Sequence, residues 1–151
     1  MPLTTQQRAD VVRAAKDWMG TPYHHQARVK GAGVDCAMFP LAVYQECGIL
    51  PADFQPPEYS MQWHLHQSEE MYLNTIEPFV REIGERDPQP ADFVIFKFGR
   101  AFSHGAIVVA WPLLIHSYIP HGVTLADALI DGQLIGREYK IFTVSTADER
   151  G

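Results

Sequence analysis

Apolar side chains recur at helical spacing near the start of the chain. The pattern predicts a helix over about residues 5–19, and Thr4 with Gln7 three positions later is typical of a capping box at its start. Gly20 is the kind of residue that ends a helix, so we expect a loop over residues 20–33. The apolar stripe consists of Val11, Val12, Ala15, Trp18 and Met19.

A second helix is predicted over residues 35–47, because apolar residues occupy most of its positions and Gly48 follows. Asp35 has the side chain of a typical N-cap. Pro40 then falls within the first turn, where its missing N–H has little effect. This places the start of the helix close to Cys36.

The pattern changes from helical to strand-like along the chain. After a proline-rich loop at 51–57 and a third helix over about 59–76, short β-rich runs separated by Gly, Pro and Asp begin at Ala91. Helices followed by strands predict an α+β domain in which N-terminal helices pack on a central antiparallel sheet. The expected strands cover residues 93–98, 105–110, 113–119 and 139–144.

Composition fits one soluble globular domain spanning residues 1–151, with 46% hydrophobic and 20% charged residues. The net charge of -6 and the lack of a Lys/Arg cluster argue against a nucleic-acid partner. No segment approaches the length of apolar chain that spans a membrane, and residues 1–10 lack the apolar stretch of a signal peptide. We therefore expect synthesis as a cytoplasmic protein without a membrane partner.

The chain has two cysteines, too few for a disulfide scaffold. If Cys36 and Cys47 lie on one helix, the helical rise puts them roughly 16 Å apart, beyond disulfide reach. Both are predicted to be free thiols. Cys36 at the helix start is a candidate nucleophile, since the positive helix terminus favours thiolate, whereas Cys47 at the far end lacks this field. The alternative for Cys36 is a small buried hydrophobic residue.

A thiol hydrolase also needs an imidazole near the sulfur and a third group that orients it. His104 and His116 each interrupt a predicted apolar strand, where a polar side chain is costly unless it is hydrogen-bonded. A mutual hydrogen bond would satisfy both. A loop of three or five residues between the strands puts the two side chains on one face of the sheet. A two-residue turn at Trp111-Pro112 puts them on opposite faces. We expect the longer loop.

Five segments, in this order, resemble the NlpC family of cell-wall cysteine peptidases, particularly its phage-associated members. The resemblance covers roughly residues 20–117 and includes an interval of twelve residues between two histidines. The segments are Gly20-Thr21-Pro22-Tyr23, Val34-Asp35-Cys36, Pro90-Ala91-Asp92-Phe93-Val94-Ile95-Phe96, Ser103-His104-Gly105-Ala106-Ile107-Val108 and Ile115-His116.

The resemblance implies a papain-like α+β fold and a set of roles. Cys36 would be the nucleophile, His104 the general base and acid, and His116 the residue that orients His104. Tyr23 would place its hydroxyl near the oxyanion, and Asp35 would hold a substrate amine, act as the N-cap, or do both. No cofactor or metal is implied.

The implied substrate is a peptidoglycan stem peptide, cut between D-glutamate and a diamino acid. The implied setting is a phage or prophage, in which lysis or a phage particle would deliver the protein and phage tail components would be its partners. The sequence departs from the family at Ala37-Met38, where most members have Ser-Gly, which leaves the substrate open. Alternative functions are an amidase or thioesterase acting on a small acyl substrate, and a non-catalytic tail or assembly module.

Zinc held by Cys36, His104 and His116 is the rival chemistry, because all three are sound zinc ligands. No helical His-Glu-x-x-His or Cys-x-x-Cys motif supports it. His64 and His66 would pair on a metal only within a strand, and we predict a helix there.

Overall fold

The structure, a computed structural model, describes residues 2–55 and 71–146. Its helices are α1 (Thr5–Asp17), α2 (Met38–Glu46) and α4 (Met71–Ile76), followed by the short 3-10 helix η1 (Glu77–Phe79). The strands are β1 (Arg28–Val29), β2 (Gly33–Val34), β3 (Val80–Glu82), β4 (Phe93–Phe98), β5 (Ala101–Ala110), β6 (Leu113–Tyr118), β7 (Gly122–Asp127) and β8 (Tyr139–Val144).

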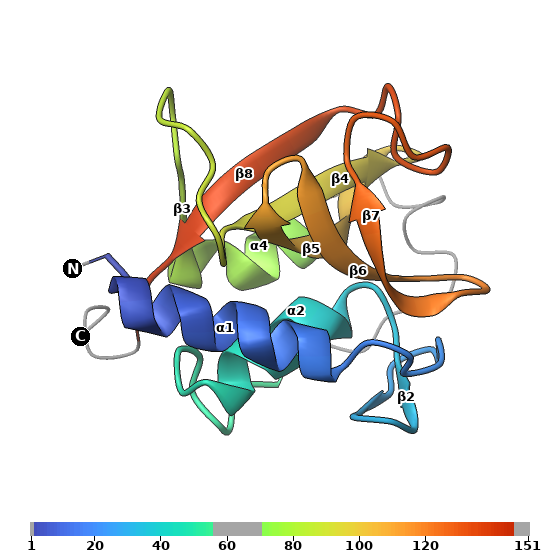
Figure 1. Cartoon of the computed structure of the whole chain (residues 1–151), viewed down its shortest axis with the longest axis horizontal. Helices are drawn as coiled ribbons and strands as arrows, with labels where there is room; N and C mark the ends of the chain where they lie inside the picture. The colour runs from blue at the N-terminus through green and yellow to red at the C-terminus, as the bar shows by residue number, and fades with distance from the viewer. Residues whose placement is uncertain (1, 56–70, 147–151) are drawn as a thin grey trace.

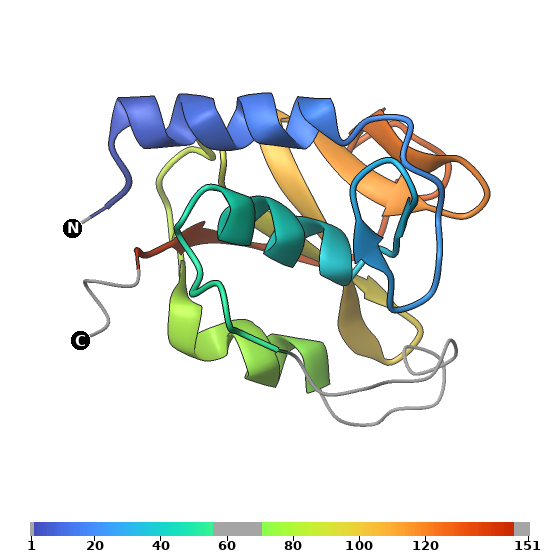
Figure 2. The same ribbon diagram turned by 90° about the horizontal axis from the view of Figure 1, so that it is seen from below.

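Six of the strands form one sheet in the order β3-β8-β4-β5-β6-β7, and every neighbouring pair is antiparallel. Figure 1 shows the strands curving across the molecule above α1 and α2. In Figure 2 the three helices lie beside one another, with α2 between α1 and α4, and cover one face of the sheet. The predicted α+β arrangement is confirmed.

The first helix begins as predicted. The Thr4 side chain accepts a hydrogen bond from the Gln7 N–H, and the Gln7 side chain accepts one from the Thr4 N–H, which is the capping box expected from the sequence. The helix ends at Asp17, two residues earlier than predicted, and Gly20 follows with a φ of 89°. That left-handed backbone favours glycine and turns the chain toward the site.

The strand predictions are confirmed for β4 and β8, whose bounds match, and for most of β5 and β6. β5 starts four residues earlier than predicted, at Ala101, and so carries His104 in its interior. Four strands were missed. β1, β2 and β3 have only two or three residues each, too few to show an alternating pattern, and β7 is a six-residue strand at the edge of the sheet.

Both faces of the sheet are covered, which explains why the first four residues of β4 are all buried. Phe93 and Ile95 belong to the core between the sheet and the helices. Val94 and Phe96 belong to a second core on the opposite face, together with Leu134 from the segment after β7. Strands buried on both faces lose the alternation of half-buried strands, as observed here.

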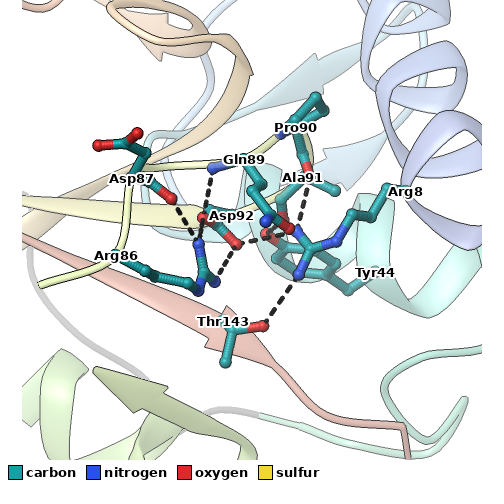
Figure 3. Close-up of polar contacts among 9 residues, drawn as sticks. All are labelled: Arg8, Tyr44, Arg86, Asp87, Gln89, Pro90, Ala91, Asp92 and Thr143. Atoms are coloured by element: carbon teal, nitrogen blue, oxygen red, sulfur yellow. Dashed lines mark hydrogen bonds and ion pairs between the residues drawn. The ribbon is translucent and has the colours of Figure 1, made fainter. Parts of the chain in front are cut away.

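A buried ion-pair network fixes α1 to the start of β4. The Asp92 carboxylate is completely buried and lies between two guanidinium groups, 2.9 Å from Arg8 Nη1 and 3.0 Å from Arg86 Nη1 (Figure 3). It also accepts a hydrogen bond of 2.8 Å from the Gln89 N–H. Nη1 of Arg8 also donates a hydrogen bond of 2.8 Å to the carbonyl oxygen of Pro90. A buried carboxylate is tolerated here because its oxygens are bonded to charged and backbone donors.

Of the predicted helix over 59–76, the structure describes only Met71–Ile76 as α4; the remainder, including His64 and His66, lies outside the described residues. Among the described residues, no helix has the length and apolar character needed to span a membrane. Cys36 and Cys47 are both free thiols, as predicted.

Candidate active site

A cavity of about 300 Å³ brings together three of the five residues selected from the sequence, namely Tyr23, Cys36 and His104. It lies where the chain before α2 meets β5 and β6. Aromatic and apolar side chains contribute much of its wall. The lining residues are Tyr23, Cys36, Phe98, Ser103, His104, Ser117, Tyr118 and Ile119.

Cys36 lies in the turn that precedes α2 and is partly accessible. Its Sγ is 3.9 Å from the hydroxyl oxygen of Tyr23, which donates to the sulfur, and 4.0 Å from the carbonyl oxygen of Ser103. Ser103 directly precedes His104 in β5. The sulfur is therefore held between the Tyr23 loop and the strand that carries the histidine.

The resting state of Cys36 differs from the sequence prediction of a thiolate favoured by the helix terminus. Burial and the neighbouring Asp35 carboxylate raise the pKa of Cys36 to about 12, although the Tyr23 hydroxyl and the backbone N–H groups of Cys36 and Ala37 oppose the rise. α2 begins only at Met38, so Cys36 lies before the first turn of the helix, where the helix field acts most strongly. The thiol is neutral at pH 7 until another group takes its proton.

The Asp35 side chain is buried next to Cys36 in the chain and does not form part of the cavity wall. The residue is 1% exposed. Its Oδ1 accepts hydrogen bonds from the N–H groups of Ala37 and Met38, at 3.1 and 2.8 Å. Its Oδ2 accepts one from the Gln26 N–H at 2.6 Å. Asp35 therefore holds the turn that leads into α2, whereas the N-cap of the helix is Ala37, and Asp35 is not on the cavity wall where it could hold a substrate amine.

The Tyr23 loop is also fixed to the chain just before Cys36. The Val34 N–H donates to the carbonyl oxygen of Pro22 at 3.0 Å, and the Val34 carbonyl accepts from the His24 N–H at 3.3 Å, so backbone bonds flank Tyr23 on both sides. The same Val34 carbonyl accepts a 2.8 Å hydrogen bond from the fully buried Ser117 hydroxyl. Ser117 thus joins β6 to the nucleophile segment.

His104 and His116 form the predicted pair. Nε2 of His104 lies 2.8 Å from Nδ1 of His116, and the two rings are nearly perpendicular, at 89°. Both residues are buried, with 4% and 3% exposure. A buried imidazole nitrogen needs a partner, and each histidine supplies one to the other.

The pair forms by a different route from the one predicted. Ala110 pairs with Leu113, so the turn is the two-residue Trp111-Pro112 turn that would place the histidines on opposite faces. The next pair is Val108 with Leu114, which leaves Val109 as an extra residue. This β-bulge shifts the register by one and returns the two histidines to the same face, as diagonal neighbours.

The charge state of His116 is set by its surroundings. Burial lowers the pKa of His116 to about 4; the charge of Asp131 acts to raise it and that of His121 to lower it. His116 is therefore neutral at pH 7. A neutral His116 with its proton on Nε2 has a lone pair on Nδ1, which accepts the Nε2–H of His104.

Several site residues were not predicted from the sequence. Phe98 and Tyr118 pack their rings on His104, with centroids 4.8 and 5.5 Å away, and Ser117 makes the bond to Val34 described above. The one available signal was Ser117, a polar residue next to His116 inside an apolar strand. His116 itself lines a second cavity. Within residues 2–55 and 71–146, no three His, Cys, Asp or Glu side chains gather as a metal-binding group.

Comparisons with known proteins identify the fold. No protein-family model matches the sequence, and no curated protein matches it. Solved structures do match. The NlpC/p60 domain of the peptidoglycan hydrolase SagA is 16% identical with a TM-score of 0.56, covering 89% of this chain and 97% of that one. NlpC2 from Trichomonas vaginalis is 14% identical with a TM-score of 0.66, covering 96% and 48%.

RipD from Mycobacterium tuberculosis, described as a non-catalytic NlpC/p60 domain protein adapted to peptidoglycan binding, is 11% identical with a TM-score of 0.56, covering 91% of this chain and 97% of that chain. The chain thus spans nearly the whole of SagA's domain and RipD, but about half of NlpC2. The SagA domain and RipD are NlpC/p60 domains and NlpC2 has the same fold, so the NlpC-type fold predicted from the sequence is confirmed.

Proposed function

We propose that this NlpC/p60 fold carries a cysteine peptidase that hydrolyses an amide bond in a peptidoglycan stem peptide. The observation that supports it most is the His104–His116 hydrogen bond of 2.8 Å, made beside a cavity that His104 shares with Cys36 and Tyr23. A nucleophile, a base and an orienting group are the three parts that covalent catalysis by a thiol requires.

In the first step His104 takes the thiol proton of Cys36 as the sulfur attacks the amide carbonyl. His104 becomes an imidazolium, and its Nε2–H donates to neutral His116. Because the pKa of Cys36 is raised to about 12, proton transfer accompanies the attack rather than preceding it. The uncharged acceptor His116 holds the imidazolium ring in one orientation.

The tetrahedral intermediate then collapses. His104 gives its proton to the leaving nitrogen, the carbon–nitrogen bond breaks, and the acyl group remains on Cys36 as a thioester. A water molecule gives a proton to His104 and attacks the thioester carbonyl. The carbon–sulfur bond breaks, the proton returns to sulfur, and a carboxylic acid leaves.

Two donors would stabilise the oxyanion formed in each step. Burial raises the pKa of Tyr23 above its usual value, so the hydroxyl keeps its proton, and it already donates to Sγ at 3.9 Å. The backbone N–H of Cys36 is the second donor. Preorganised donors of this kind act most strongly in a site shielded from water.

The test is hydrolysis of soluble stem peptides from digested peptidoglycan, followed by mass spectrometry. The proposal predicts new amine and carboxyl termini, with a combined mass gain of one water molecule, and no product with Cys36→Ala. Cys47→Ala, a thiol substitution at the other end of α2, should retain activity. Products with Cys36→Ala, or none with wild type on any stem peptide, would contradict the proposal.

A second candidate, a binding module without catalysis, is favoured by one observation. Cys36 carries a neutral thiol of raised pKa, and RipD provides a precedent for an NlpC/p60 domain described as non-catalytic. This alternative predicts that wild type and Cys36→Ala bind purified peptidoglycan equally well and that neither cleaves it.

A third candidate keeps the chemistry and changes the substrate. Phe98, Tyr118 and Ile119 give the cavity apolar walls, which suit an amidase or thioesterase acting on a small acyl group. Faster turnover of simple amides or thioesters than of stem peptides would favour it. For the stem-peptide reading we propose a phage setting, with delivery by lysis or by a phage particle and its tail components.

A further inference from the structure

A second cavity, of about 250 Å³, is lined by His116 but not by His104. Among the described residues, Tyr118 alone lines both cavities. The histidine pair and Tyr118 therefore separate the nucleophile pocket from a polar chamber. The chamber is lined by His116, Tyr118, His121, Thr124, Leu125, Ala126, Asp131 and Gln133.

The ring of His116 connects the two cavities. Its Nδ1 faces His104, so Nε2 points to the opposite side of the ring. Every deeply buried side-chain nitrogen or oxygen among the described residues has a hydrogen-bond partner. No hydrogen bond joins Nε2 of His116 to another described residue, so this atom opens to the chamber and reaches solvent there.

Besides Tyr118 of β6, which lines the same chamber, charged and titratable groups surround His116 from three parts of the chain. His104 on β5 is hydrogen-bonded to it, His121 lies in the turn between β6 and β7, and Asp131 follows β7. Asp131 is the acidic residue that lines the chamber. Its Oδ2 accepts a hydrogen bond from the Asp127 N–H, which holds the carboxylate in place.

We propose that Asp131 is a positioning residue that acts across this chamber to keep the proton of His116 on Nε2, leaving Nδ1 to accept the hydrogen bond from His104. A negative charge favours an N–H dipole directed toward it, and a water molecule in the chamber can carry the interaction. The direction in which Asp131 acts on the pKa of His116 agrees with this placement.

The tautomer of His116 also affects whether His104 can take the proton of Cys36, the proposed nucleophile. If His116 carried its proton on Nδ1, that N–H would face His104 Nε2, and His104 would have to accept there and hold its own proton on Nδ1. Two N–H groups would meet once His104 became an imidazolium. Asp131 therefore favours the one tautomer of His116 that is compatible with a protonated His104.

Nitrogen NMR of histidine side chains tests the proposal without any substrate. At pH 7 we expect His116 in wild type as the Nε2–H tautomer, in about tenfold excess over the other form. His116→Gln assigns the signal. In Asp131→Asn the excess should fall several-fold and the pKa of His116 should drop below the wild-type value. Asp131→Glu, which keeps the charge, should restore both.

Asp127→Asn is the matched control, since Asp127 is the last residue of β7, close to Asp131 in the chain, but does not line the chamber. It should leave the His116 signals unchanged. The Nδ1–H tautomer in wild type would overturn the proposal, and this result needs no variant. An unchanged tautomer ratio and titration in folded Asp131→Asn would overturn it as well.

The kinetic corollary rests on the proposed function. Asp131→Asn should lower kcat about tenfold at constant KM and shift the acidic limb of the pH profile, whereas Asp127→Asn should not. If wild type has no hydrolase activity while the NMR result is as expected, the proposed function fails and the role of Asp131 stands. If wild type is active and Asp131→Asn changes neither the NMR result nor the kinetics, the proposed role of Asp131 is wrong while the proposed function stands.

Discussion

Nε2 of His104 lies 2.8 Å from Nδ1 of His116 because Val109 bulges out of β5. The Trp111-Pro112 turn alone would direct the two side chains to opposite faces of the sheet. One extra residue between Val108 and Ala110 restores a common face. β-bulges of this kind often redirect side chains near functional sites, and here the bulge creates the pair on which the proposed chemistry depends.

Asp35 is predicted to stabilise the fold by fixing the Tyr23 loop to the start of α2. Asp35→Ala leaves the N–H groups of Gln26, Ala37 and Met38 without their acceptor and should lower the free energy of unfolding by about 3 kcal/mol. Asp35→Asn keeps one acceptor oxygen and should lose less. Chemical denaturation of the two variants and wild type measures the difference.

A role of Asp35 as a substrate ligand gives a different result. Both variants would then raise KM for peptides with a free amine and leave the unfolding free energy unchanged. Removing the charge has a further effect, because Asp35 raises the pKa of Cys36. Asp35→Asn should therefore react faster with thiol reagents than wild type at the same pH.

His116 makes stability depend on pH in the acidic range. The folded protein binds a proton at His116 only near pH 4, whereas the unfolded chain binds one near pH 6.5. Between these values the unfolded state holds more protons, so the unfolding free energy falls as pH drops from 6.5 to 4, by up to about 3 kcal/mol. Denaturation curves of wild type and His116→Gln at a series of pH values measure this.

His116→Gln lacks the titrating imidazole, so its unfolding free energy should not show this fall between pH 6.5 and pH 4. His24→Gln serves as the control, since His24 is exposed. A wild-type protein and a His116→Gln variant with parallel stability profiles between pH 6.5 and 4 would mean that His116 is not held neutral by burial.

Tyr23→Phe tests the oxyanion role. Removing one preorganised donor should lower kcat by about 100-fold with KM unchanged, because the hydroxyl acts on charge that develops only in the transition state. Steady-state kinetics on a cleaved stem peptide would measure both constants. Tyr139→Phe, in an exposed tyrosine of β8, should leave them unchanged. An equal kcat for Tyr23→Phe and wild type would show that the hydroxyl has no such role.

Local patterns predicted much of the architecture. The Thr4 capping box and strands β4 and β8 follow from short-range signals, namely a cap with its partner three residues on and β-branched or aromatic runs between turn residues. The pairing of His104 with His116 was also predictable, since two polar residues inside apolar strands need partners.

What the sequence did not reveal depends on contacts between distant segments. No local pattern marks Val109 as a bulge, so the turn length was predicted wrongly while the pairing was right. The neutral state of Cys36 depends on burial, which a helix-terminus argument leaves out. Asp131 comes near His116 only through the path of the chain after β7, and nothing at that position suggests it.

The central claim is that His104 activates Cys36, and alkylation of Cys36 by iodoacetamide tests it most directly. The rate is followed from pH 5 to pH 10 in wild type and His104→Ala, each with Cys47→Ala so that one thiol reports. We predict measurable alkylation at pH 7 that falls at least about tenfold without His104, because the imidazole takes the thiol proton. Equal rates in both proteins, rising only as the pH approaches the raised pKa of Cys36, would contradict the account.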